Sequence, residues 1–198
     1  MSLDKIEATP KTGSEQLTYN GNQLDFSLLD FWRWSVSDLL SNATRGRFAE
    51  FIVATAINID KTVVRDEWSP YDLETSDGIK LEIKSAAFIQ SWSQKNHSKI
   101  SFSTKAALSW NLETSQQSAV KMRHADVYVF CLLNRTSEQD IDPLNMNHWE
   151  FYVMSTKELD NYSRSQHSIT LKSLQSLTTL VSYNQLNDAI KEKYKLNF

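Results

Sequence analysis

The sequence predicts a mixed α/β fold in which a central β-sheet is flanked by helices. Residues 125–133 (ADVYVFCLL) form an apolar run with the length of a buried strand. Residues 79–86 alternate apolar with polar side chains, which is the period of a strand with one buried face. Helical patterns precede and follow these strands, and that order favours helices packed against a mixed sheet.

The chain is expected to form a single domain over residues 24–198, after an N-terminal tail or arm of residues 1–23. Those first residues hold two of the four glycines and few large apolar side chains, a composition typical of chain ends that are not tied down. The whole chain of 198 residues is long enough for one domain with a substantial core.

The remaining elements follow from caps, periodicity and turn residues. Helices are expected at residues 26–40, at 45–57 after the candidate cap Asn42-Ala43-Thr44, somewhere between 105 and 123, from Ser155-Thr156 to Tyr162, and over 183–195. Strands are expected at residues 63–68, 71–74, 99–103 and 149–154, with a turn at 75–78 and a polar loop at 135–143.

Composition excludes several classes of protein. Cys131 is the only cysteine, which excludes an internal disulfide framework and a cysteine-based zinc site. No apolar run reaches the ~18 residues that a membrane-spanning helix needs, and the first residues lack the apolar segment of a secretory signal. We therefore expect a protein of the reducing cytoplasm with no membrane partner.

The charge pattern restricts how the chain could contact nucleic acid. Its formal net charge is −3, whereas proteins that coat nucleic acid are usually basic, so any such contact must be local. Residues 91–125 carry five Lys or Arg side chains against one acid, with two tryptophans among them. This stretch is a candidate surface for a nucleic-acid backbone, and an ordinary solvated surface is the alternative.

Glu50 is the first candidate for chemistry. On a helical wheel it lies at the centre of an apolar face, with Gly46 beside it. A buried carboxylate is costly unless it finds a cation, a metal or a proton. The alternative interpretation is a surface glutamate or one paired with Arg47.

A hairpin around Gly78 brings further carboxylates together. Side chains alternate along residues 79–86, so Glu82 and Lys84 share a face. A three-residue turn over 76–78, with Gly78 in the left-handed region, matches apolar with apolar residues across the hairpin and charged with charged ones. The resulting pairs are Thr75–Ile79, Glu74–Lys80, Leu73–Leu81, Asp72–Glu82 and Tyr71–Ile83. Asp72 and Glu82, roughly 5 Å apart at Cβ, would repel each other and need a cation such as Mg²⁺ or Mn²⁺.

These residues resemble the motifs of the PD-(D/E)XK nuclease superfamily, which has the restriction-endonuclease-like fold. The resemblance lies in a helix glutamate, the triplet Pro70-Tyr71-Asp72 and, after nine further residues, Glu82-Ile83-Lys84. The arginine-glycine lead-in to Glu50 resembles the first motif of many members. Ser85, Gln90 and Trp92 resemble an uncharacterised bacterial group within the superfamily. The Gln-x-x-x-Tyr helix of the recombination-type nucleases is absent here, so the restriction-enzyme-like branch is the closer match.

The resemblance implies a Mg²⁺-dependent endonuclease that hydrolyses phosphodiester bonds of DNA, in restriction or phage defence. In that family pattern Asp72 and Glu82 bind Mg²⁺, for which Mn²⁺ can substitute, and the main-chain carbonyl of Ile83 is a further ligand. Glu50 binds through water or holds a second metal ion, and Lys84 orients or deprotonates the attacking water. The expected nucleic-acid contacts are Arg47, Ser85, Gln90, Trp92 and Lys95.

Three alternatives stay open at this point. The chain could be a catalytically silent nucleic-acid-binding or protein-interaction module on the same fold, although the presence of all three carboxylates and the lysine argues against this. RNA could replace DNA as the substrate. Because two strands need two sites, a homodimer is also open, with residues 168–198 as a candidate interface.

Overall fold

The computed structural model describes residues 6–60, 62–111 and 116–198, and its centre is a five-stranded mixed sheet. The strand order is β11 (Leu180–Val181), β9 (Trp149–Ser155), β8 (Val127–Leu133), β4 (Lys80–Ala87) and β3 (Leu73–Glu74). The pair β4–β8 is parallel, and the other pairs are antiparallel. The expected mixed α/β fold is therefore confirmed.

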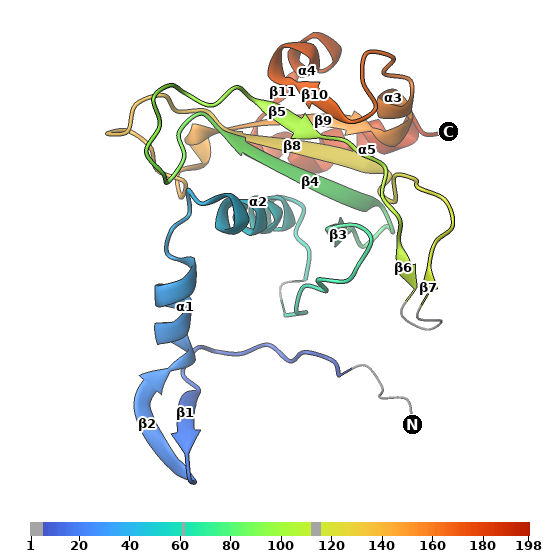
Figure 1. Ribbon diagram of the computed structural model, residues 1–198. Coiled ribbons are helices and arrows are strands. Elements are labelled where there is room, and N and C mark those ends of the chain that lie inside the picture. The colour runs from blue at the N-terminus through green and yellow to red at the C-terminus, as the bar shows by residue number, and fades with distance from the viewer. Residues whose placement is uncertain (1–5, 61, 112–115) are drawn as a thin grey trace.

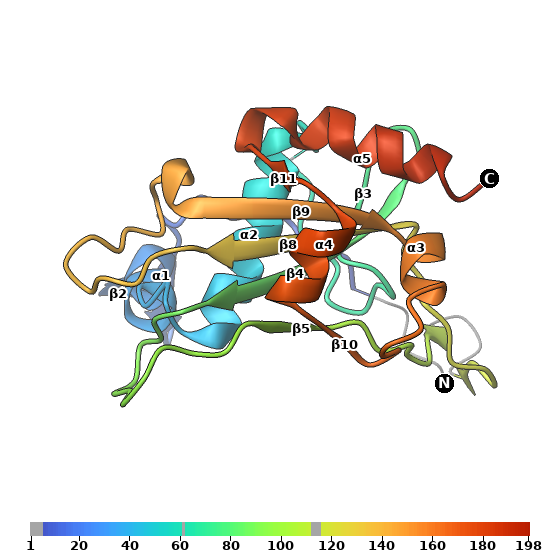
Figure 2. The same cartoon turned by 90° about the horizontal axis from the view of Figure 1, so that it is seen from above.

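Helices cover both faces of this sheet (Figures 1 and 2). One face packs against α2 (Asn42–Ala56) and α5 (Leu186–Lys195), with Val53 and Ile190 in its core. The other face packs against α3 (Thr156–Asp160), α4 (Leu171–Leu177) and a ribbon of β5 (Ser101–Ser103) with β10 (Ser168–Thr170). Two 3₁₀ turns, η1 (Met146–His148) and η2 (Tyr183–Gln185), precede β9 and α5.

The strand β8 explains why the run 125–133 is apolar throughout. All seven of its residues are buried, because strands flank it on both edges and helices cover both faces. Strand β4 keeps its alternation, with Leu81 and Ile83 buried against α2 and the charged residues on the other side. The predictions for both strands are confirmed.

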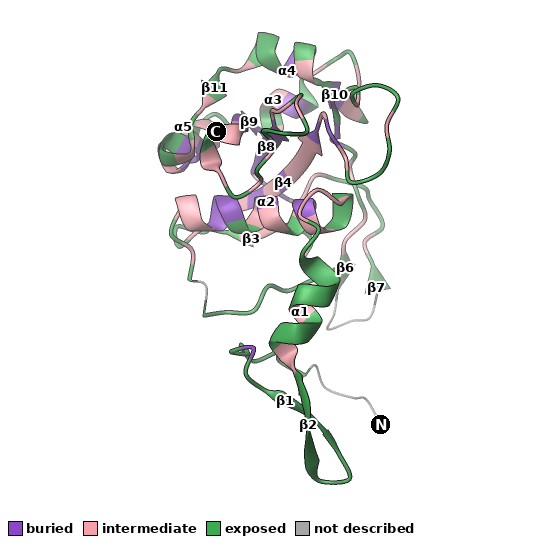
Figure 3. Ribbon diagram, turned by 90° about the vertical axis from the view of Figure 1, so that its left-hand side faces the viewer, coloured by how far each residue is buried: buried purple, intermediate pink, exposed green. Residues whose placement is uncertain are grey.

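An N-terminal arm extends away from the sheet (Figure 3). It consists of the hairpin β1 (Gln16–Tyr19) and β2 (Asn22–Ser27), joined by Asn20 and Gly21 with φ of 49° and 78°, followed by α1 (Leu28–Val36). Positive φ at both turn residues is the type I′ geometry that suits a two-residue hairpin. The helix expected at residues 26–40 thus occupies 28–36, and none of its residues is buried.

Two predicted elements are wrong. No strand occurs at residues 63–68, where charged side chains turn back toward α2 instead of alternating. Within the described part of 105–123 there is no helix; β6 (Trp110–Asn111) pairs with β7 (Gln116–Gln117) instead. This stretch is rich in Ser, Thr and Asn, whose side chains compete for backbone hydrogen bonds, as Ser118 Oγ does by accepting from Ser109 N–H at 2.9 Å.

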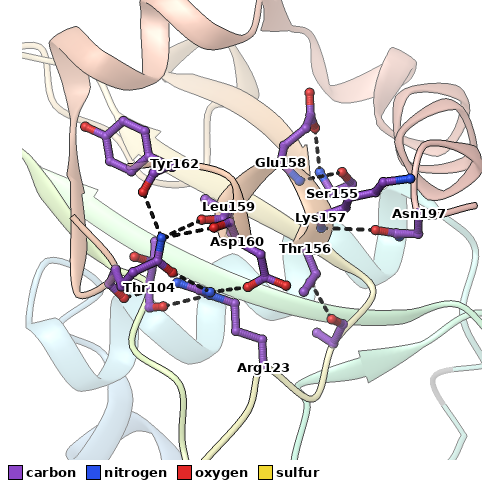
Figure 4. Close-up of polar contacts among 12 residues, drawn as sticks. Thr104, Arg123, Ser155, Thr156, Lys157, Glu158, Leu159, Asp160, Tyr162 and Asn197 are labelled. Atoms are coloured by element: carbon purple, nitrogen blue, oxygen red, sulfur yellow. Dashed lines mark hydrogen bonds and ion pairs between the residues drawn. The ribbon is translucent and has the colours of Figure 1, made fainter. Parts of the chain in front are cut away.

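Polar contacts anchor the segment that leads into β8 (Figure 4). Arg123, whose side chain is 5% exposed, donates to the Thr104 carbonyl at 2.9 Å and pairs with Asp160 at the end of α3. Ser155 and Glu158 form the capping box that starts α3, as the Ser155-Thr156 pattern predicted. Arg123, near the end of the connection from β5 to β8, is therefore fixed to Thr104 at its start and to α3.

The C-terminal segment packs into the chain's own core. Leu174, Leu186 and Ile190 are buried, and Tyr183 Oη donates to Thr55 Oγ1 on α2 at 2.9 Å. The helix expected at 183–195 is present as η2 and α5, whereas α4 and the strands β10 and β11 were not anticipated. Among the described residues, no helix has the length and apolar character required to cross a membrane.

Candidate functional site

The hairpin of β3 and β4 has the expected turn and register. Gly78 has φ of +79° and donates its N–H to the Thr75 carbonyl at 2.9 Å. Leu73 pairs with Leu81, and Glu74 pairs with Lys80. A glycine at this position permits the left-handed backbone that the three-residue turn requires.

The pairing stops at Leu73, the residue after Asp72, because β3 begins there. The predicted pairs Asp72–Glu82 and Tyr71–Ile83 are therefore wrong. The Asp72 N–H donates to the Leu81 carbonyl at 2.9 Å. Its carboxylate Oδ2 accepts the Ile83 N–H at 2.7 Å, in the place that a backbone carbonyl of a longer β3 would take. This hydrogen bond fixes Asp72 at the edge of β4, just before β3 begins.

The main chain of Ile83 faces the same edge. The Lys80 carbonyl points toward β8, where it accepts from Asp126 N–H at 2.8 Å. The N–H and C=O of one strand residue point to the same side, and successive residues alternate. Because the Ile83 N–H points to Asp72, its carbonyl also points to this open edge, as a metal ligand there would require.

Glu50 reaches the same region from α2, and its partner is Arg65. The Arg65 guanidinium binds the Glu50 carboxylate with two of its nitrogens, one of them at 3.3 Å, and lies 3.6 Å from Asp72 Oδ1. The Glu50 side chain is only 12% exposed. The alternative pairing with Arg47 does not occur, because Arg47 binds Glu67. Arg65 was missed from the sequence because residues 63–68 were assigned to a strand.

Glu82 and Lys84 project from β4 as an ion pair. Their side chains are 20% and 30% exposed, so this pair is partly shielded from water. Glu82 and Lys84 lie on the same side of β4, as the alternation of side chains along a strand predicted.

The carboxylates affect one another's protonation. Burial raises the pKa of Glu82, and the negative charge of Asp72 raises it further, against the opposing effect of Lys84. Burial also raises the pKa of Glu50, with Asp72 acting in the same direction and Arg65 in the opposite one. The three carboxylates repel one another when ionised, so positive charge nearby stabilises their ionised forms.

Arg65 and Lys84 now supply that positive charge. Among the residues that the structure describes, no three His, Cys, Asp or Glu side chains are gathered closely enough to hold a metal ion as they stand. The available donors are nevertheless all oxygens: carboxylates of Glu50, Asp72 and Glu82 and the Ile83 carbonyl. Oxygen-only sets suit hard cations such as Mg²⁺. A metal would have to displace Arg65 from Asp72 to bind here.

Two cavities border these groups. The first, of about 530 Å³, is lined by Glu50, Arg65 and Asp72 together with apolar side chains such as Phe51 and Val64. The second, of about 430 Å³, is lined by Lys84, Ser85 and other residues described below. Lys84 therefore lies between the carboxylates and a separate hollow.

The expected nucleic-acid contacts divide into two groups. Ser85 and Gln90 both accept hydrogen bonds from the buried Arg45, at 3.1 and 2.9 Å, and Trp92 lines the same second cavity at 51% exposure. Arg47 and Lys95 do not join them: Arg47 lines the first cavity, and Lys95 lines a third hollow together with Glu138. Ser85 and Gln90 thus position Arg45, which links α2 to the end of β4.

Comparison with known proteins gives one family. A family model described as bacteriophage T4 endonuclease IV matches residues 21–173, which include every residue of the site above. No match was found among the curated proteins.

Proposed function

We propose that this chain, which belongs to the bacteriophage T4 endonuclease IV family, cuts DNA with a metal-dependent site at the open edge of β4. Membership of an endonuclease family implies nuclease activity on DNA. The observation that carries the finer proposal is the Asp72 carboxylate, which the Ile83 N–H holds beside the Glu82–Lys84 pair. This arrangement supports assignment to the PD-(D/E)XK superfamily, whose sequence pattern the hairpin follows.

In the proposed site, Asp72, Glu82 and the Ile83 carbonyl would hold Mg²⁺, or Mn²⁺ in its place. The bound ion would supply an activated water and neutralise charge on the phosphate oxygens. Asp72 is pre-positioned for this, because its other oxygen is already fixed by the Ile83 N–H. Glu50 would act on the bound ion through water or hold a second ion.

Lys84 would act on the attacking water and on the phosphate. Its ammonium group is paired with Glu82. As an ammonium group, Lys84 would orient the attacking water and stabilise the negative charge that develops on the phosphate. To take a proton from that water, Lys84 would first have to give up its own.

The energetic cost of the site favours an enzyme over a silent module. Keeping Glu50 and Glu82 largely shielded from water raises the pKa of both and costs stability. A module that only binds DNA or protein gains nothing from that arrangement. The proposal also includes a role in restriction or phage defence, which a plating assay with Lys84→Ala as control would test.

The experiment that tests the function is a cleavage assay with plasmid, linear duplex, single-stranded DNA and RNA. Each substrate is incubated with Mg²⁺, Mn²⁺ or EDTA, using wild type, Lys84→Ala, Asp72→Asn and the control Lys195→Ala on α5. We expect metal-dependent cutting of DNA that only the two site variants lose. Absence of cutting on every substrate, with no metal binding by calorimetry, would favour the silent module; cutting of RNA alone would reassign the substrate.

Homodimerisation is a separate part of the proposal, since cutting both strands of a duplex requires two sites. Light scattering at the concentration of the cleavage assay decides it, and a monomer that still makes double-strand breaks would rule out the need for a dimer.

A further inference from the structure

The second cavity has a charge opposite to that of the carboxylate site. It lies between the start of α2, the end of β4 and the segment before β5, and its volume is about 430 Å³. Among the residues that the structure describes, its charged lining residues are Arg45, Lys84 and Lys99, and no Asp or Glu lines it. By contrast, Glu50 and Asp72 line the first cavity. A hollow whose charged lining residues are all cations is suited to an anion.

Arg45 places a buried positive charge in the wall of this cavity. It is 3% exposed and forms no ion pair among the described residues. Its hydrogen-bond acceptors are all neutral: the Leu40 carbonyl at 2.8 Å, Asn42 Oδ1 at 2.7 Å, Ser85 Oγ at 3.1 Å and Gln90 Oε1 at 2.9 Å. Burial lowers the pKa of Arg45, and Asp38 is the acid that opposes this from a distance. The guanidinium is therefore held in place without a neutralising carboxylate beside it.

The rim of the cavity adds groups that suit a nucleotide. Lys99 is exposed at the rim, and Trp92 is 51% exposed there. Ser85 Oγ accepts from Arg45, which leaves its own hydroxyl hydrogen to be donated elsewhere. A phosphate binds cations and hydroxyl donors, and a nucleic-acid base stacks on an exposed indole.

We propose that this cavity binds the nucleotide next to the scissile phosphodiester, its phosphate beside Lys99 and Arg45 and its base on Trp92. The inference rests on the proposed function, because Lys84 connects the two sites: it pairs with Glu82 and lines the cavity. One strand could then lie with its scissile phosphate at Glu82 and the neighbouring phosphate in the cavity.

The test combines changes in the protein with changes in the substrate. A cleaved oligonucleotide is prepared with one phosphate at a time replaced by an uncharged methylphosphonate. At one position beside the scissile bond we expect wild type to lose about tenfold in kcat/KM, chiefly through KM. Lys99→Gln should lose a similar factor in kcat/KM on the unmodified substrate. A methylphosphonate at that position should then lower kcat/KM of this variant no further. Lys195→Gln on α5, also an exposed lysine, is the matched control and should behave as wild type.

Gly46 provides a second, independent variant. It lines the cavity within α2, and a Cβ built there meets no atom within 4 Å. Gly46→Met favours the helix while adding bulk at the cavity wall, so folding should be kept and KM raised. If no flanking phosphate shows a loss that Lys99→Gln removes, or if Gly46→Met cleaves with the KM of wild type, the subsite is refuted.

A binding measurement separates this inference from the proposed function. Fluorescence anisotropy of a labelled single-stranded oligonucleotide is recorded in EDTA, where cleavage plays no part. Lys99→Gln, Gly46→Met and Trp92→Ala should each weaken binding several-fold relative to Lys195→Gln. If wild type cuts nothing but shows this binding pattern, the proposed function fails and nucleotide binding in the cavity stands. If it cuts but all variants bind alike, the subsite fails.

Discussion

Arg65 is predicted to compete with metal for the carboxylates of the site. It binds Glu50 with two nitrogens and lies 3.6 Å from Asp72 Oδ1, so it occupies the space where a cation would bind between them. Substituting Arg65→Gln removes the charge and keeps a polar side chain of intermediate length. The variant should bind divalent metal more tightly than wild type, although it loses an ion pair.

The magnitude follows from how exposed the ion pairs are. The Arg65 side chain is 36% exposed, so each interaction is screened by solvent. A two-nitrogen contact of this kind contributes about 1 kcal/mol, and the longer contact with Asp72 about half as much. Metal binding must break both, so Arg65→Gln should lower the Kd for Mn²⁺ or Mg²⁺ roughly tenfold. In EDTA the same variant loses both contacts and should be less stable by about 1.5 kcal/mol.

Isothermal titration calorimetry of wild type and Arg65→Gln with Mn²⁺ measures this difference. The control is Arg33→Gln, because Arg33 pairs with Asp30 on α1, outside the site. The reasoning is refuted if Arg65→Gln binds Mn²⁺ as tightly as wild type or more weakly. Absence of Mn²⁺ binding in both proteins would refute the metal site itself.

Other outcomes concern stability. Arg45→Met leaves four acceptors without their donor and should lower the free energy of unfolding by about 2–4 kcal/mol in urea denaturation, whereas Arg33→Met should change it by under about 0.5 kcal/mol; equal effects would contradict the buried-network assignment. Gly78→Ala, at φ of +79°, should cost about 1–2 kcal/mol, while Gly46→Ala in α2 should be neutral or stabilising; a Gly78→Ala protein as stable as wild type would show that the turn does not need the left-handed backbone. The pKa of Glu82 is raised above its ordinary 4.5 in the folded protein. Protonation of Glu82 therefore contributes to the free energy of unfolding fully below pH 4.5, and this contribution is lost as the pH rises through the folded-state pKa. Thermal unfolding in EDTA should therefore show Glu82→Gln gaining stability relative to wild type as the pH is raised from 4.5, and a difference that stays constant with pH would contradict the shift.

The site could be predicted from the sequence as far as it depends on local geometry. Alternation places Glu82 and Lys84 on one side of a strand, and Gly78 sets the turn, so the pairs Leu73–Leu81 and Glu74–Lys80 follow. The position of Asp72 was less accurate, because pairing patterns cannot show where a strand stops. Its carboxylate replaces the backbone acceptor that one more residue of pairing would have provided.

The errors in the fold have two origins. Residues 63–68 carry β-branched and aromatic side chains typical of strands, but Arg65 and Glu67 form ion pairs with side chains of α2, which outweigh strand preference. In the described part of 105–123, short polar side chains of the same stretch take over backbone hydrogen bonds, which outweighs helix preference.

The sequence by itself therefore determined the buried strands, the turn at Gly78 and the shared side of Glu82 and Lys84 on β4, because these depend on periodicity and on neighbouring residues. Only the tertiary structure decided that Arg65 neutralises Glu50 and that Ser85 and Gln90 hold Arg45. Those partners lie 15, 40 and 45 residues apart along the chain. Ion pairs and hydrogen bonds across such separations form only when packing brings the elements together, and no pattern along the chain specifies them.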